Sequence, residues 1–337
     1  MPRKGLINIL ILDFSYEWWN SGYGFNFNKS YFQNPDVKAK TNAAMHEKLC
    51  ERFPWFKAYR PAPFGISVEP YGHRFIPAMF GCEIKFGDAT APWAENNILT
   101  REEIEATPMM TLEEYKQIDI VRETESQIKY ARAKYGGCSG QQNKGGVMNT
   151  AIYLRGMDLF SDFYESPATV HKLFNLISNR MFLSYEHGKE LDGRATDTGV
   201  GNCTVCMVSP DVYDEFVYPQ DLAFMELAKS NGVRFSVHHD SDATKYVESY
   251  KRLEYLHHID VGFDTDVALF RKNFPHVVLN IYLYTSFLLE RTAGEIAADV
   301  KKLAALAGGP KNTWFTCADV DDNIPDEKVT ALYEAAG

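Results

Sequence analysis

Short apolar runs alternate with longer amphipathic segments through the C-terminal half of the chain, and this order constrains the fold more than any other feature. Strand-length runs are expected at 232–237, 259–263, 277–283 and 313–316, and helices at 209–230, 243–256 and 292–306. Such an order is typical of a parallel sheet whose strands are joined by crossover helices. Because no repeat or low-complexity linker interrupts the chain, we expect one closed α/β barrel rather than two domains.

Capping signals mark where several helices begin. The pattern Thr-x-x-Glu starts at Thr100, Thr111 and Thr292, and it predicts a capping box that satisfies free backbone N–H groups. Ser166 and Ser209 are each followed by proline, which predicts an N-cap and a first helical residue. These signals place helix starts throughout residues 100–292.

Composition and charge argue against several classes of protein. The net charge is −10 and the isoelectric point about 5.4, whereas a nucleic-acid-binding protein requires a basic face. The apolar run at 6–12 reaches Asp13 without a cleavage site, so it predicts a strand rather than a signal peptide. No stretch approaches the roughly 20 apolar residues of a membrane span. We therefore expect a cytoplasmic protein whose six cysteines are reduced.

A polar cluster ends the strand expected at 232–237. Side chains alternate between the faces of a strand, so His238 and Asp240 share one face, and His239 follows the buried residues Phe235 and Val237 on the other. An imidazole and a carboxylate two residues apart form half of a divalent-metal site. The pattern predicts His239 to be a packed or supporting residue.

A cysteine follows another predicted strand in the same manner. Cys317 comes directly after the run at 313–316, and the C-terminal ends of parallel barrel strands form one rim. We therefore expect His238, Asp240 and Cys317 to converge there. Thiolate, imidazole and carboxylate together are a ligand set that zinc accepts.

Three other segments could carry function but have simpler interpretations. The aromatic stretch at 16–27 is interpreted as a loop that packs over the body of the protein, with a substrate-contacting lid as the alternative. The glycine-rich tract at 136–146 matches no phosphate-binding pattern, so it is interpreted as a loop. Cys203 and Cys206 spell C-x-x-C without a second pair, which favours buried thiols over a zinc ribbon.

The C-terminal half resembles the uroporphyrinogen decarboxylase superfamily. The stretch Ser209–Pro219 is similar to its recurrent S-P-x-x-Y-x-E-F-x-x-P, and Leu154–Leu159 with Ser166, Pro167 and His171 resembles a family helix pair. The resemblance implies a single (β/α)8 TIM barrel. It covers roughly residues 75–337, a stretch with the length of a domain. We accordingly expect a barrel at 71–337 and an aromatic-rich N-terminal extension at 1–70 that packs on it.

Within that superfamily, the site resembles the zinc-dependent, corrinoid-linked methyltransferases, which carry His-x-Cys after one strand and a second cysteine after the last. His238 and Cys317 match the histidine and the distal cysteine, whereas Asp240 stands at the position of the first cysteine. The resemblance implies that Asp264 is an additional or exchangeable ligand and that Asn202 contacts substrate.

Two departures from the family pattern reduce the number of functions that the resemblance allows. The R-Q-A-G-R-Y motif that binds porphyrinogen carboxylates is missing, which disfavours decarboxylation, and the G-N-x-x-P turn is replaced at 279–284. The tyrosines of that segment, including Tyr282, suit an aromatic substrate. A carboxylate at position 240 makes zinc a harder Lewis acid than a thiolate does.

The resulting hypothesis is a zinc-dependent methyltransferase that moves a methyl group from an O-methyl donor, such as an aryl methyl ether, to cobalt(I) of a corrinoid (cobalamin) on a partner protein. Asn202, His239, Asp264 and Tyr282 are the expected substrate-binding residues. The alternatives are methylation of a thiol such as coenzyme M, porphyrinogen decarboxylation, and a non-enzymatic barrel that binds a tetrapyrrole or corrinoid.

Overall fold

The structure is a computed structural model that describes residues 9–96, 98–138, 145–309 and 311–336. These residues form two compact units. The first unit contains the described parts of 1–15, 144–149 and 195–337, and the second those of 16–143 and 150–194. The expected division at 70/71 stays a prediction. The strand near the N-terminus joins the first unit because it pairs with the last strand.

The first unit is built on a parallel sheet of six strands in the order β1-β8-β7-β6-β5-β4. The strands are β1 (Ile9–Phe14), β4 (Thr198–Gly201), β5 (Phe235–His239), β6 (Leu256–Gly262), β7 (Val278–Leu283) and β8 (Thr313–Val320). Among the described residues the sheet has edges at β1 and β4, where a closed eight-stranded barrel would have two further strands. The α/β class and the parallel sheet are confirmed.

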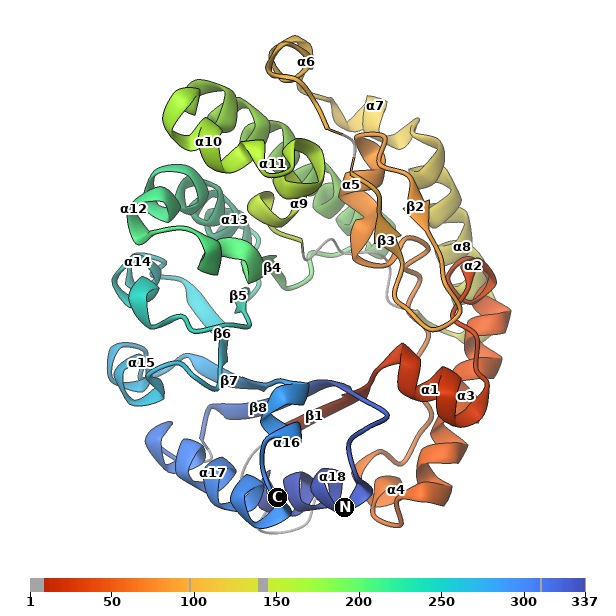
Figure 1. Cartoon of the computed structure of the whole chain (residues 1–337). Helices are drawn as coiled ribbons and strands as arrows, with labels where there is room; N and C mark the ends of the chain where they lie inside the picture. The colour runs from red at the N-terminus through yellow and green to blue at the C-terminus, as the bar shows by residue number, and fades with distance from the viewer. Residues whose placement is uncertain (1–8, 97, 139–144, 310, 337) are drawn as a thin grey trace. The chain divides into compact units, whose positions relative to one another are not determined.

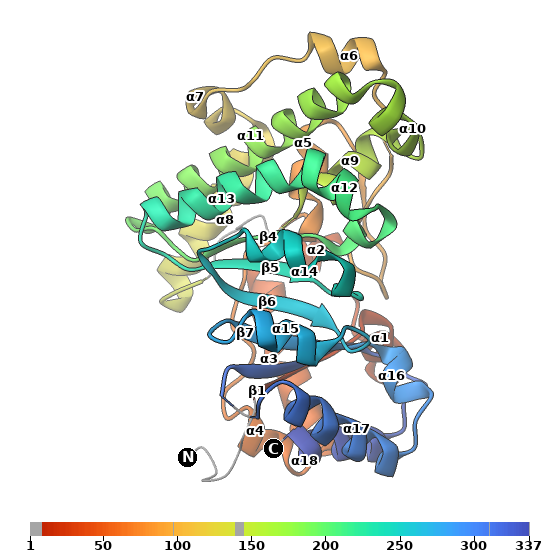
Figure 2. The ribbon, with the colours of Figure 1, turned by 90° about the vertical axis from the view of Figure 1, so that its left-hand side faces the viewer.

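Helices follow the strands of the first unit, as crossover connections require. They are α12 (Pro210–Val212), α13 (Tyr218–Ser230), α14 (Val247–Lys251), α15 (Val267–Asn273), α16 (Thr285–Leu289), α17 (Ala293–Leu306) and α18 (Asp326–Ala336). A π-helical turn, Tyr213–Val217, joins α12 to α13. Figures 1 and 2 show α13, α14, α15 and α17 along one side of the strands. The helix expected at 243–256 is shorter: a 3-10 turn occupies Thr244–Tyr246, α14 ends at Lys251, and β6 begins at Leu256.

The two faces of this sheet differ in polarity. Val237, Ile259 and Leu279 are paired across β5, β6 and β7, and none of them is exposed. The next row along the same strands is polar, with His238 paired to Asp260 and Asp260 to Asn280. Since successive side chains point to opposite faces, the apolar row packs on one side and the polar row lies on the other.

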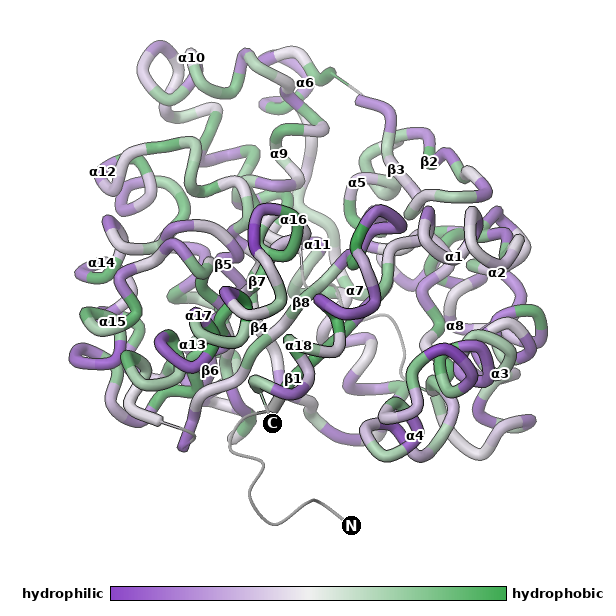
Figure 3. Tube along the Cα trace, turned by 60° about the horizontal axis from the view of Figure 1, so that its bottom comes forward, coloured by the Kyte–Doolittle hydropathy of each residue, from purple (hydrophilic) through white to green (hydrophobic). Residues whose placement is uncertain are grey.

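Helices make up most of the second unit. They are α1 (Tyr16–Tyr23), α2 (Lys29–Gln33), α3 (Pro35–Arg52), α4 (Phe56–Tyr59), α5 (Phe75–Met79), α6 (Arg101–Ala106), α7 (Leu112–Lys116), α8 (Asp119–Tyr135), α10 (Asp158–Glu165) and α11 (Pro167–Asp192). A short antiparallel pair consists of β2 (Ile84–Lys85) and β3 (Trp93–Ala94), and the limit between the units falls within α9 (Val147–Arg155). The helices change between hydrophobic and hydrophilic colours along their turns (Figure 3). No described helix has both the length and the apolar composition that crossing a membrane requires.

The local signals in the sequence have mixed outcomes. Capping boxes are present at Thr100, Thr111 and Thr292, as expected. The aromatic stretch at 16–27 is not simply a loop, because its first eight residues form α1. Within the second unit the ring of Trp18 lies 4.7 Å from that of Trp19 and 4.7 Å from the guanidinium of Arg52.

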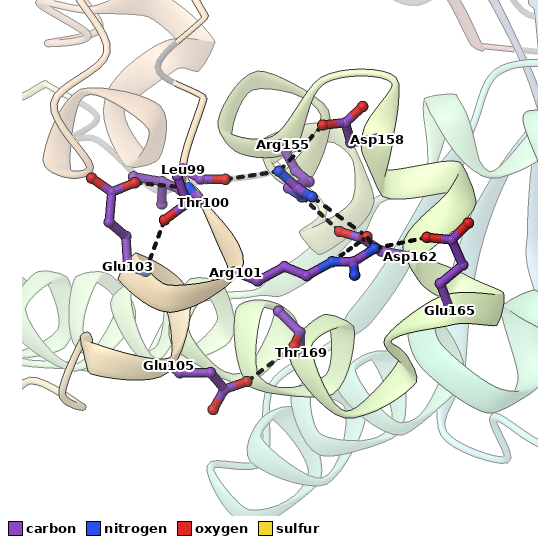
Figure 4. A network of polar contacts seen from close by, with 10 residues as sticks. All are labelled: Leu99, Thr100, Arg101, Glu103, Glu105, Arg155, Asp158, Asp162, Glu165 and Thr169. Atoms are coloured by element: carbon purple, nitrogen blue, oxygen red, sulfur yellow. Dashed lines mark hydrogen bonds and ion pairs between the residues drawn. The ribbon is translucent and has the colours of Figure 1, made fainter.

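A buried carboxylate ties three helices of the second unit together. Asp162 on α10 accepts a hydrogen bond from Nε of Arg155 at 2.6 Å and from Nη2 of Arg101 at 2.6 Å (Figure 4). The Asp162 side chain is only 2% exposed. Arg101 also reaches Glu165, and Arg155 donates to the carbonyl of Leu99. A carboxylate buried to this degree requires such partners, because an unpaired buried charge is strongly destabilising.

Candidate metal centre

Three side chains with metal-binding atoms gather at the C-terminal ends of β4 and β5. They are Cys203, which begins a 3-10 turn (Cys203–Met207) after β4, His238 on β5, and Asp240 directly after β5. Their candidate ligand atoms all lie within 4.8 Å of one another, and each residue is partly buried. Nε2 of His238 is 3.5 Å from Oδ2 of Asp240. The cluster lies entirely within the first unit.

A second carboxylate orients the imidazole of His238. Asp260 is its register partner on β6, and Oδ2 of Asp260 lies 2.5 Å from Nδ1 of His238. The other oxygen, Oδ1, contacts Nε2 of His258 at 2.6 Å and accepts from Nδ2 of Asn280 at 2.8 Å. Asn280 accepts in turn from Oγ1 of Thr316 at 3.0 Å. A carboxylate on Nδ1 leaves Nε2 free for a metal, which is the usual arrangement for a histidine ligand.

The charges of the cluster favour a cation. Burial opposes the charged form of His238, but hydrogen bonding to Asp240, Asp260 and Cys203 outweighs it and raises the pKa of the imidazole well above its usual range. Burial also acts to raise the pKa of Asp240 and Asp260, yet their hydrogen bonds to the histidine lower both pKa values below the ordinary carboxyl value. Excess negative charge around one imidazole is what a divalent cation would neutralise.

The structure does not bring Cys317 to this cluster. Cys317 pairs with Leu283 on β7 and Leu12 on β1, and its side chain is fully buried. Thr316, one position earlier, contacts Asn280 and therefore faces the polar row of the sheet, so Cys317 faces the opposite side. Burial raises the pKa of the Cys317 thiol to about 12. The expected convergence is thus found for His238 and Asp240, and Cys203 takes the third position.

The expected substrate-binding residues lie in different environments. The ring of Tyr282 is 5.3 Å from that of His238, beside the cluster. Asp264 is exposed after β6 and is not part of the cluster. Asn202 is 1% exposed and donates to Asp221 at 2.7 Å, so its amide is engaged inside the protein. His239 is fully buried with Nδ1 2.7 Å from the hydroxyl of Tyr250, as its position on the strand predicts.

Sequence reasoning missed two residues of this site. The C-x-x-C spelling marked Cys203, but the cysteine was assigned to packing because no second pair follows. Its position just after a strand is the signal that could have placed it on the rim. Asp260 gave a weaker signal, because its contact with His238 depends on the register between two strands.

The donor set fits zinc. Zinc accepts thiolate, imidazole and carboxylate ligands, and a site with three protein ligands leaves a fourth position for water or substrate. Cys203, His238 and Asp240 supply one ligand of each type, and Asp260 supports the histidine. Such a site can polarise an oxygen atom or activate a thiol.

Comparisons with known proteins assign the chain to a family. Residues 57–336 match the model of the family described as Uroporphyrinogen decarboxylase (URO-D). Among solved structures, a methyltransferase from Methanosarcina mazei aligns with a TM-score of 0.68 at 16% sequence identity, covering 98% of this chain and 93% of that chain, so the two share a fold. The apo form of the 3-keto-D-glucoside 4-epimerase YcjR from E. coli aligns at 11% identity over 71% of this chain and 97% of that chain, with a TM-score of 0.30 that supports no argument. No curated protein matches. Since the family model spans the whole cluster and five of the six sheet strands, the chain belongs to the uroporphyrinogen decarboxylase (URO-D) family.

Proposed function

We propose that this protein is a zinc-dependent methyltransferase that moves a methyl group from an O-methyl donor to cobalt(I) of a corrinoid carried by a partner protein. The observation that supports it is the cluster of Cys203, His238 and Asp240 at the C-terminal strand ends, with Asp260 behind the histidine. Strand ends of this kind carry the active site in barrel enzymes. Membership of the family and a shared fold with a methyltransferase agree with the proposal.

The ligand set favours oxygen rather than sulfur as the atom that loses the methyl group. Cys203, His238 and Asp240 would hold zinc through one thiolate, one imidazole and one carboxylate, and zinc with this set would supply a harder Lewis acid for an ether or alcohol oxygen than zinc with two thiolates. In the transfer, the bond between the methyl carbon and oxygen breaks and its electron pair stays on oxygen. The bond to cobalt forms with the electron pair of cobalt(I).

Tyr282 can assist the departing oxygen. Burial, the largest cause, raises the pKa of its phenol to about 12, so the hydroxyl keeps its proton at neutral pH. A protonated phenol beside the metal ligands is a hydrogen-bond donor, and donors aimed at a developing oxyanion stabilise it. The Tyr282 ring is also 6.0 Å from that of Tyr284, and the two rings offer an apolar face to an aryl group.

The test combines metal content with methyl transfer. Purified protein should hold about one zinc per chain, and His238→Ala should lose most of it. Zinc-loaded protein is then incubated with a cobalt(I) corrinoid protein and a panel of methoxyarenes and methanol, and the cobalt spectrum is recorded. Methylcobalt and the demethylated alcohol or phenol should appear together, and His238→Ala should produce neither.

Two results would count against the proposal. Full methyl transfer by metal-free protein would remove the role of zinc. Discharge of methylcobalt onto a thiol, with no methylation of cobalt by any donor, would favour the thiol-methylating alternative.

A further inference from the structure

A buried carboxylate lies behind the candidate ligands and takes no part in the chemistry proposed above. Asp221 on α13 is 2% exposed, and its Oδ2 accepts hydrogen bonds from Nδ2 of Asn202 and from the hydroxyl of Tyr213, both at 2.7 Å. Both donors are neutral. Burial raises the pKa of Asp221 to about 7, although the two hydrogen bonds act to lower it.

Burying a carboxylate of this kind costs more free energy than burying an apolar side chain of the same size. Removing an ionised carboxyl group from water costs several kcal/mol unless a cation or many donors compensate, and an apolar residue of similar volume would avoid that cost. The position of Asp221 therefore calls for a reason other than packing. The reason we find is the segment that its hydrogen bonds hold.

Asn202 connects Asp221 to both strands that carry the candidate ligands. Its backbone N–H donates to the carbonyl of His238 at 2.7 Å, and the next residue in the chain is Cys203. Its side-chain amide also reaches the hydroxyl of Tyr250 at 3.5 Å, which lies 2.7 Å from Nδ1 of His239. The backbone and side-chain hydrogen bonds of Asn202 thus fix the turn that holds Cys203 against the end of β5.

The surrounding residues hold the same turn from its other end. The hydroxyl of Tyr246 lies 2.6 Å from the carbonyl oxygens of both Val205 and Val208, and Nζ of Lys245 donates to the latter at 2.9 Å. Tyr213 sits at the start of the π-helical turn before α13, and such turns occur frequently at functional sites.

We infer that Asp221 is a positioning residue of the metal centre: through the hydrogen bond to Asn202 it sets the distance between Cys203 and the ligands His238 and Asp240. The inference rests on the proposed metal site. Residues that orient metal ligands without touching the metal typically change metal affinity by about 10- to 100-fold when replaced. Asp221 and Asn202 act on Cys203 through one shared hydrogen bond, so removing either should have the same effect.

The test uses cobalt(II) as the metal, because thiolate coordination to cobalt(II) gives a ligand-to-metal absorption band that reports on Cys203 directly. Asp221→Ala and Asn202→Ala should each weaken cobalt(II) binding by about 10- to 100-fold in competition with a chelator. Both should lower the thiolate band at saturating metal. The double variant should be no worse than either single variant, as coupled residues are not additive.

Two matched controls separate positioning from general damage. Asp221→Asn keeps an oxygen that accepts from Asn202, so it should restore the wild-type spectrum. Tyr213→Phe removes the other donor to Asp221 and should leave cobalt(II) affinity within about threefold, which is about 0.7 kcal/mol because tenfold corresponds to about 1.4 kcal/mol.

The outcomes distinguish this inference from the proposed function. Wild type that binds neither cobalt(II) nor zinc would refute the metal site itself. Wild type that binds cobalt(II), together with an unchanged affinity and thiolate band in Asn202→Ala, would refute only the positioning role. Asn202→Ala decides the matter even if Asp221→Ala does not fold, because it breaks the same hydrogen bond from the other side.

Discussion

Replacing Asp221 by asparagine should stabilise the protein at alkaline pH. The substitution keeps the size of the side chain and an oxygen acceptor, and it removes the ionisable group. The pKa of Asp221 rises from an ordinary 3.8 to about 7 in the folded protein. Between these two values the unfolded chain has released the proton and the folded chain has kept it, so the stability of the wild type falls as pH rises through this window.

The size of the effect follows from the same shift. A difference of roughly three pKa units corresponds to about 4 kcal/mol. Ionisation of Asp221 lowers the free energy of unfolding by this amount once pH exceeds 7. At pH 5 less than half of this penalty is present, because the folded carboxyl is still protonated. Asparagine carries no such penalty at any pH. The free energy of unfolding of Asp221→Asn relative to wild type should therefore rise by roughly 2 to 3 kcal/mol between pH 5 and pH 8.

Urea denaturation of metal-free protein, followed by circular dichroism at several pH values, measures this difference. The comparison between variant and wild type cancels the titration of every other group that the two share. A difference that stays constant from pH 5 to pH 8, or that falls, would refute the assignment of Asp221 as a buried carboxylate with a raised pKa. A carboxyl that keeps its ordinary pKa in the folded protein would give a difference that does not depend on pH.

Three further predictions concern the metal centre and the second unit. Cys203→Ser should lose most of the bound zinc and Cys317→Ser should keep it, as measured by metal analysis; the reverse pattern would restore the assignment of Cys317 from the sequence. Asp260→Asn should weaken zinc binding by about 10- to 100-fold in a chelator competition, and an unchanged affinity would contradict its orienting role. Asp162→Asn should lower the free energy of unfolding by about 3 kcal/mol in thermal or urea denaturation, with zinc content unchanged, because it breaks a buried ion pair far along the chain from the ligands. A neutral effect on stability would show that Arg101 and Arg155 do not depend on that charge.

Signals confined to a few consecutive residues determined much of the fold. The three Thr-x-x-Glu capping boxes begin helices because each satisfies backbone donors within one turn, without help from distant residues. The alternation at 235–239 placed His239 in the buried face for the same reason, since the period of a strand is local. The sequence of apolar runs and helices likewise sufficed for a parallel α/β sheet.

Only the tertiary structure decided which residues meet. The partner of His238 is Asp260 because β5 and β6 pair in one register, and a shift of one residue would turn Asp260 to the opposite face. The same rule separates Cys317 from the cluster: β8 continues past residue 316, so the cysteine lies within the strand and faces the apolar side. Asp221 could not have been linked to Cys203 from the sequence, since the amide of Asn202 connects segments that become neighbours only when the sheet and α13 have packed. Strand periodicity is a property of the chain itself, but register and packing depend on interactions between segments distant in sequence, and the candidate ligand set depends on register and packing.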